Sequence, residues 1–231
     1  MMINVSISDE VAEACPDLHI WALSCRVHNS ESDGRLWEEI VAEEKSIRET
    51  VKLEQVNKWL PIQATRQAYK RFGKDPNRYR PSAEALRRRV LRGLPLYQVD
   101  TLVDLINLVS IRSGYSIGGF DADKIEGDRL VLGVGREGEV YHGIGRGELN
   151  IAGLPVYRDA IGGIGTPTSD EERTKIGLET TNLLMIINGY SGQDGLSVAG
   201  GYAADLLSRY VSAENIMVEL ISASGRSPIL I

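Results

Sequence analysis

A short polar stripe on an apolar helix is the part of this sequence best suited to chemistry. Asp100, Asp104 and Asn107 are spaced by four and three residues, which places their side chains on one face of a helix. The other residues of the segment 99–109 are mostly apolar, which predicts a buried helix. Buried carboxylates and amides are costly without partners, so these three residues must cap, pair or bind something. Capping of nearby loops is the alternative to a functional role for Asp100 and Asp104.

Two glycine pairs form the second group of candidates. Gly118 and Gly119 follow the helix, and Gly162 and Gly163 follow a predicted strand. Glycine lets the backbone come close to another segment or to a ligand. We therefore expect two turns, and we predict that both lie beside Asn107 around one shared pocket.

A basic segment is the third group. Between Arg66 and Arg92 the basic residues are opposed only by Asp75 and Glu84, although the whole chain has a net charge of -6. Such a cluster is typical of a surface that contacts a phosphate backbone. The alternative is a solvated helix face that pairs with the acidic residues around 38–54. The candidate nucleic-acid contacts, with two from a later loop, are Arg78, Arg80, Arg87, Arg88, Arg89, Arg173 and Lys175.

Three other patterns do not indicate a site. Gly133–Gly138 spells G-x-G-x-x-G, but a strand and turn pattern follows it where a dinucleotide site needs a helix. Gly114–Gly118 spells G-x-S-x-G, but a helix precedes the serine where a nucleophile elbow needs a strand. His19, His28 and His142 are scattered singly, so a zinc site is not expected. We expect no metal and no cofactor.

Composition narrows the class of protein. The 231 residues are enough for a sizeable core, and Cys15 and Cys25 cannot build a disulfide framework. No apolar run approaches the roughly 20 residues of a membrane span, and the N-terminus lacks the pattern of a signal peptide. We therefore expect a cytoplasmic globular protein without a membrane partner.

The elements that must position these residues change in type along the chain. The first part is rich in helix, with a strand at 18–27, a helical region at 36–72 broken at Pro61, and a helix capped by Ser82. The second part is rich in strand, and the expected elements are strands at 129–134, 139–144, 151–160, 182–188 and 215–221 and a helix at 202–210. This order predicts an α+β fold. We expect an N-terminal strand and helical segment at 1–80 that packs on a domain at 81–231.

Several short motifs in this order resemble one known domain. They are VDLIN (Val103–Asn107), GYS (Gly114–Ser116), FDADKI (Phe120–Ile125), AIGGI (Ala160–Ile164) and TTNLLMI (Thr180–Ile186). Together they resemble the B3/B4 domain of the phenylalanyl-tRNA synthetase beta subunit, which implies a B3/B4-like mixed sheet domain. The chain has no room for the catalytic core of a synthetase. We therefore expect a free-standing relative with a helix-rich N-terminal part.

The resemblance also implies an activity and a set of site residues. In the synthetase, this domain hydrolyses the ester of tyrosine wrongly attached to the phenylalanine tRNA. Asn107 matches the pocket asparagine of the family, and we expect Asn107 and Asp104 to act as catalytic residues that position substrate and water. We expect the substrate-binding positions, whose backbone amides would face the ester carbonyl, to be Gly118, Gly119, Gly162 and Gly163.

Three positions depart from the family pattern. Ile106, Gly118 and Met185 stand where family members carry a threonine, a histidine and a glutamate. A site that reads a hydroxyl group depends on such buried polar groups, so selectivity for tyrosine is not implied.

The leading hypothesis is a protein that binds tRNA or aminoacyl-tRNA and hydrolyses a mischarged aminoacyl ester, that is, an aminoacyl-tRNA deacylase. The alternative from another class is a non-catalytic module that binds tRNA or a free amino acid. A third hypothesis, a fold reused for an unrelated small molecule, predicts no salt-dependent RNA binding. The sequence does not indicate the amino acid, the tRNA or the oligomeric state.

Overall fold

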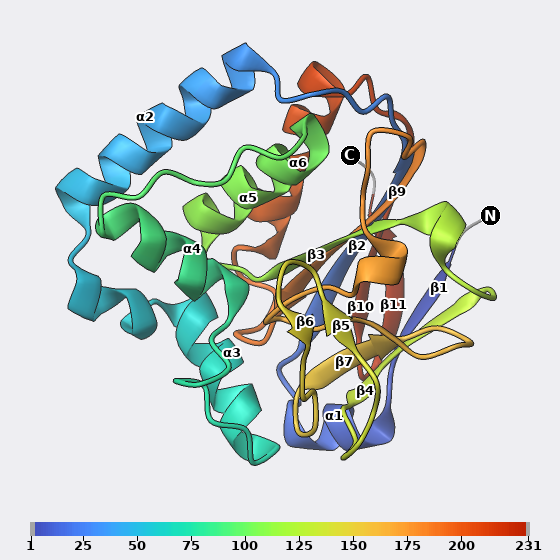
Figure 1. Ribbon diagram of the computed structural model, residues 1–231. Coiled ribbons are helices and arrows are strands. Elements are labelled where there is room, and N and C mark those ends of the chain that lie inside the picture. The colour runs from blue at the N-terminus through green and yellow to red at the C-terminus, as the bar shows by residue number, and fades with distance from the viewer. Residues whose placement is uncertain (1–2, 230–231) are drawn as a thin grey trace.

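The computed structural model describes residues 3–229 and shows an α+β fold built on two main sheets (Figure 1). The five-stranded sheet has, in order, β11 (Gly225–Ile229), β10 (Glu214–Ser222), β2 (His19–Arg26), β9 (Asn182–Gly189) and β3 (Ile117–Asp121). The four-stranded sheet has, in order, β1 (Asn4–Ile7), β4 (Arg129–Val134), β7 (Pro155–Arg158) and β8 (Gly163–Gly165). A separate hairpin joins β5 (His142–Gly143) to β6 (Gly147–Glu148).

The remaining elements are helices. They are α1 (Asp9–Ala14), α2 (Gly34–Thr50), α3 (Leu60–Arg71), α4 (Ser82–Leu91), α5 (Thr101–Ser113) and α6 (Leu196–Tyr210). Short 3-10 helices are η1 (Leu53–Lys58), η2 (Ala122–Lys124) and η3 (Glu172–Thr174). In Figure 1, α5 and α6 lie next to each other beside the five-stranded sheet, and α2 runs along the outside of α5.

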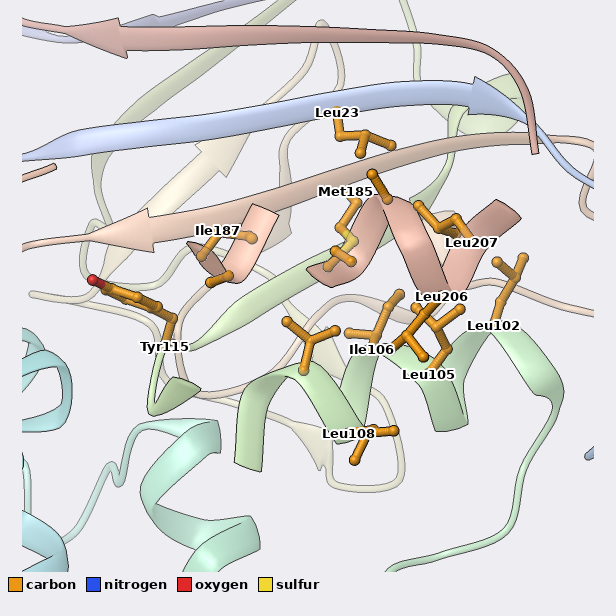
Figure 2. Packing of buried hydrophobic residues seen from close by; sticks show 14 of the residues in the cluster. Leu23, Leu102, Leu105, Ile106, Leu108, Tyr115, Met185, Ile187, Leu206 and Leu207 are labelled. Atoms are coloured by element: carbon orange, nitrogen blue, oxygen red, sulfur yellow. The ribbon is translucent and has the colours of Figure 1, made fainter. Parts of the chain in front are cut away.

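The two central strands are buried on both faces. In β2, Trp21 and Leu23 belong to the core shared with α2, α5 and α6, whereas Ile20 and Ala22 belong to the core shared with the four-stranded sheet. The neighbouring strand β9 alternates in the same way, and Figure 2 shows Met185 between β9 and the helices. A strand between two apolar layers needs apolar residues on both faces, which explains the continuous apolar run at 182–188.

The central helix has the boundaries that its residue types favour. The carboxylate of Asp100 accepts a hydrogen bond from the Val103 backbone N–H at 2.9 Å, which caps the first turn. Gly114 ends the helix in the left-handed conformation, at φ 80°, which costs glycine little. The predicted capping by Ser82 is wrong by one position, because Pro81 occupies the N-cap of α4 and the Ser82 side chain makes no capping bond.

The N-terminal segment does more than pack on the rest of the chain. Its strand β2 lies between β9 and β10, and its strand β1 pairs in parallel with β4. Residues from both sides of position 80 therefore share one sheet and one core.

Three of the four paired glycines lie in strands where turns were expected, and Gly162 lies in a bend just before β8. Gly118 and Gly119 belong to the edge strand β3, and Gly163 begins β8. A Cβ atom on Gly118 would lie 2.7 Å from the Phe120 ring, and one on Gly119 would lie 2.5 Å from Cδ1 of Ile106. Close packing against the strand, and not a turn, is the reason for glycine at these positions. The expected strands at 139–144 and 151–160 are likewise shorter, at 142–143 and 155–158.

Candidate binding cleft

A cleft with a volume of about 650 Å³ lies between the helices α4 and α5 and the loop at 166–176. The helical wall carries Ser82, Leu86, Val103, Asn107 and Ser110, and the facing wall carries Gly119, Thr166, Thr168, Ser169 and Asp170. Ile106, Ile117 and Ile176 add apolar surface, and Arg89, Arg146 and Lys175 contribute the positive charge. The cleft therefore combines an apolar part, a polar part and cations, a combination typical of small-molecule sites.

Asp170 is the one acidic residue among those that line the cleft. Its Oδ2 accepts a hydrogen bond from the Gly119 backbone N–H at 3.2 Å, while its Oδ1 accepts none from any residue at 3–229. Burial raises the pKa of this carboxyl to about 8, and the single backbone hydrogen bond only partly opposes that shift. A carboxyl with such a perturbed pKa in a cleft is a candidate for function.

Asn107 lies across the same cleft on α5 and is partly exposed. Its side chain makes no hydrogen bond to another residue of the described part of the chain, so its amide is free for a ligand. By contrast, the neighbouring hydroxyl of Ser110 donates to the Tyr115 carbonyl at 2.8 Å, and the hydroxyl of Thr168 is hydrogen-bonded to Tyr69 at 2.9 Å. Those hydroxyls serve the fold.

We call Arg89, Arg146 and Lys175 the rim cations, because these charged side chains line the cleft and are exposed or partly exposed. The guanidinium of Arg89 stacks on Tyr97 at 3.8 Å and donates to the Pro95 carbonyl at 2.6 Å. Arg146 stands at the turn between β5 and β6 and makes no ion pair within 3–229. Lys175 pairs with Glu172 at 2.7 Å on the surface. Surface pairs of this kind are weak, so the Lys175 ammonium is not firmly held by Glu172.

A model of the family described as B3/4 domain matches residues 64–198. The chain belongs to this family. The match begins inside α3, so β2 lies outside it although β2 is central to the sheet. The recognition made from the short motifs is thereby confirmed.

The fold of this B3/4 protein is similar to one solved structure in particular, a crystal structure of an N-terminal fragment of the phenylalanyl-tRNA synthetase beta subunit from Pyrococcus horikoshii. The TM-score is 0.51 at 13% sequence identity, and the match covers 99% of this chain and 55% of the fragment. The chain thus spans about half the length of that fragment, and the likeness describes the fold. The comparison with curated proteins returned no match.

Glu84 explains where much of the basic segment of this B3/4 protein is directed. It is 1% exposed, and its carboxylate pairs with Arg66 at 2.8 Å, with Arg88 at 2.8 Å and with Arg80 at 3.6 Å. We call these four residues the Glu84 cluster. The alternative of a basic face paired to acidic residues thus applies to Arg80 and Arg88, although their partner is on α4 and not in the region 38–54.

Two other arginines of the predicted phosphate surface are also engaged. Arg87 is 2% exposed, stacks on Trp59 at 3.2 Å and donates to the Ile111 carbonyl at 2.6 Å. Its burial lowers the pKa of the guanidinium to about 10. Arg173 makes two hydrogen bonds to Asp159, at 2.8 and 3.0 Å. Of the remaining predicted contacts, Arg89 and Lys175 line the cleft, and Arg78 is exposed.

Asp104 lies away from the cleft, on another face of α5. It is 1% exposed and accepts hydrogen bonds from Ser32 Oγ at 2.5 Å, Trp37 Nε1 at 2.7 Å and the Val99 backbone N–H at 3.0 Å. All its partners belong to the fold, so the side chain joins α2 and the 93–100 segment to α5. The spacing of four and three residues placed Asp104 near Asn107 on the helix, but a buried polar stripe can serve two different neighbours.

The two glycine pairs also lie in different parts of the structure. Gly119 lines the cleft, whereas Gly162 lines a different depression beside Arg136 and Arg158. Gly163 is buried, where a Cβ atom would meet Tyr141 and Val156 at 3.0 Å. The structure therefore brings Asn107 and Gly119 together but not Gly162 and Gly163.

Asp170 and Arg146 are cleft residues that the sequence motifs did not indicate. Asp170 stands in a polar loop next to Glu171 and Glu172, and nothing in the local sequence distinguishes it from them. Arg146 stands between two glycines, Gly145 and Gly147, which indicated only a turn. Among residues 3–229, no helix could cross a membrane, and no group of three possible metal-ligating side chains was found.

Proposed function

We propose that the cleft of this B3/4 protein binds the aminoacylated end of a tRNA and that the protein hydrolyses a mischarged aminoacyl ester there. The observation that carries the proposal is the combination in one cleft of a free amide on Asn107, a carboxyl on Asp170 and the rim cations. An aminoacyl end offers a matching set of groups, namely a side chain and an ester on one part and phosphates on the other.

The role of each cleft residue follows from whether its polar atoms already have a hydrogen-bond partner within the fold. The Asn107 amide can orient the ester and the attacking water, because it has no other hydrogen-bond partner within the described chain. The rim cations would hold the phosphates that follow the terminal nucleoside. The Gly119 backbone N–H already donates to Asp170, so it supports that carboxyl and is not free to stabilise the ester carbonyl.

The test is a deacylation panel. Purified protein is incubated with a set of tRNAs, each charged with a correct or an incorrect amino acid, and release of the amino acid is followed. The wild type should release a subset, and Asn107→Ala should release it at least about tenfold more slowly, as expected for loss of a positioned polar group. Asn57→Ala, on η1 and outside the cleft, is the control that should keep the full rate.

A second candidate function is binding without hydrolysis. It is favoured by the apolar or small residues Ile106, Gly118 and Met185 at positions where the resembling synthetase domain carries polar groups. Binding of aminoacyl-tRNA with no release of the amino acid, unchanged in Asn107→Ala, would select this function. Absence of salt-dependent RNA binding would exclude both candidates.

A further inference from the structure

Building on the proposed function, we infer that Asp170 binds the α-ammonium group of the aminoacyl end. The cleft should then select aminoacyl groups with a free amino group against N-acylated ones. Three observations support this role, namely the missing cation partner of this carboxyl, its place as the single acidic group lining the cleft and the room that glycines leave for it.

Asp170 differs from the other enclosed carboxylates. Asp100 and Asp104 also lack a cation within the described chain, but they lie outside the cleft, where Asp100 caps α5 and Asp104 accepts three hydrogen bonds. Glu84 pairs with arginines, Asp159 pairs with Arg173, and Asp121 pairs with Lys124 at 3.2 Å. Asp170 has no ion pair among residues 3–229, and the pKa of about 8 reports this lack of compensation. Burial of a carboxylate without a cation is costly, so an arriving ammonium group would supply the missing partner.

The cleft and the ligand both carry charges of the two signs. The single carboxyl lies on the wall formed by β3 and the 166–176 loop, and the rim cations carry the positive charge. An aminoacyl-tRNA end has its ammonium on the acyl group and its phosphates beyond the ribose. Attraction of the ammonium to the carboxyl and of the phosphates to the rim cations would make the two sets of charges complementary.

Two glycines leave room for the carboxyl of Asp170. A Cβ atom on Gly165 would lie 2.9 Å from Oδ1 of Asp170, and one on Gly118 would lie 3.6 Å from the same atom. The Gly119 N–H fixes the other oxygen, Oδ2. Oδ1 is thus the acceptor that remains for an ammonium N–H.

The apolar residues of the cleft specify the rest of the ligand. Ile106, Ile117 and Ile176 lie in the same cleft as Asp170. They favour an aliphatic or aromatic side chain on the amino acid. Suitable probes are therefore L-leucinamide and L-phenylalaninamide, with their N-acetyl derivatives as matched ligands that lack the positive charge.

The experiment measures binding of these probes by calorimetry to the wild type, to Asp170→Asn and to Asp128→Asn, which changes an exposed carboxyl outside the cleft. The wild type and Asp128→Asn should bind at least one amide roughly tenfold more tightly than its N-acetyl derivative, as expected for a charge-assisted hydrogen bond. Asp170→Asn should lose this preference. Asparagine can still accept the Gly119 hydrogen bond, so the fold should be retained, and thermal unfolding verifies this.

Proton release is a second measurement that a structural role of Asp170 would not change. At pH 6.5 the carboxyl is mostly protonated, because its pKa is about 8. Ion-pair formation with the ammonium must then expel a proton. Calorimetry in buffers of different ionisation enthalpy should report close to one proton released per amide bound to the wild type, and none for Asp170→Asn.

Equal affinity of the wild type for each amide and its N-acetyl derivative would overturn the inference, and so would binding of neither. A preference retained in Asp170→Asn would do the same. The wild-type comparison alone keeps the test decisive if the variant unfolds. Equal deacylation of aminoacyl-tRNA and N-acetyl-aminoacyl-tRNA would uphold the proposed function and refute this inference. Amide binding with proton release, but no deacylation, would uphold the inference and refute hydrolysis.

Discussion

Glu84 on α4 and Asp170 in the 166–176 loop are two enclosed carboxyls whose surroundings differ. Glu84 is held by Arg66, Arg80 and Arg88, so its negative charge is compensated within the fold. Asp170 has one backbone hydrogen bond and no cation among the residues at 3–229. The same chemical group therefore stabilises the structure in one place and remains available for a ligand in the other.

The difference shows how to separate structural from functional charge in this molecule. A charged group whose partners all belong to the fold contributes to stability, and its removal leaves those partners buried and unpaired. A charged group without a partner costs stability and is retained where it binds something. Substitution of a charged group that is paired within the fold should therefore reduce stability and leave binding unchanged. Substitution of an unpaired charged group in the cleft should reduce binding without reducing stability.

The largest expected effect follows from Glu84→Gln. The change leaves three arginines without their common counter-charge, so we expect the free energy of unfolding to fall by about 3–5 kcal/mol. Urea unfolding at pH 7 measures this loss. Glu38→Gln, at an exposed position of α2, should change stability by less than about 0.5 kcal/mol. If Glu84→Gln lost less than about 0.5 kcal/mol, the Glu84 cluster would not be a stabilising feature of the fold.

Asp104→Ala should have the next largest effect. The substitution leaves the N–H or O–H donors of Ser32, Trp37 and Val99 without their acceptor, which should cost about 2–3 kcal/mol of stability. Binding of the amide probes should be unchanged in the folded variant. Asn107→Ala should show the reverse pattern, with near wild-type stability and impaired deacylation. If folded Asp104→Ala bound the amide probes more weakly than the wild type, Asp104 would have to be counted among the binding residues.

The pH dependence of stability tests Asp170. Because its folded-state pKa is raised from 3.8 to about 8, the folded protein keeps this proton while the unfolded chain loses it. The contribution of Asp170 to stability is therefore fully present below about pH 4 and is lost as the pH rises to about 8. Asp170→Asn should be more stable than the wild type near pH 8, by on the order of 1 kcal/mol or more, and the gap should shrink toward pH 4. A gap that does not vary with pH would show that the Asp170 carboxyl ionises normally in the fold.

The smallest effect on stability is expected at the rim cations. Arg146→Ala and Lys175→Ala should each change the unfolding free energy by less than about 0.5 kcal/mol. Each should weaken tRNA binding and reduce the slope of log affinity against log salt by about 0.7–0.9 for every phosphate that the variant no longer neutralises. Arg136→Ala, beside the depression that contains Gly162, is the control with an unchanged slope. Equal slopes for all three variants would place the RNA elsewhere on the surface.

The fold was largely predictable because its main elements follow local patterns. The apolar run at 182–188 predicted a strand buried on both faces, and β9 is such a strand. The segment 99–109 predicted a buried helix, which α5 confirms, and Asp100 and Gly114 limit that helix as their residue types favour. These features depend on spacing along one segment, which the sequence contains.

The site was predictable only in part, because partners distant in the sequence decide which charges are free. The arginines at 87–89 look alike in the sequence, yet Arg87 is stacked on Trp59, Arg88 is paired with Glu84, and Arg89 lines the cleft. Asp170 looked like any acid of a polar loop. Its isolation becomes visible only when Gly119 and the surrounding core are placed around it.

The sequence by itself determined the family, the α+β class and the helix that carries Asn107, since short motifs and periodicity are local properties of the chain. Only the tertiary structure decided that Asp104 and the Glu84 cluster support the fold while Asp170 and the rim cations face a cleft. The physical reason is that the free energy of a charge depends on its burial and its neighbours. Those neighbours are brought together by folding from positions that are far apart in the sequence.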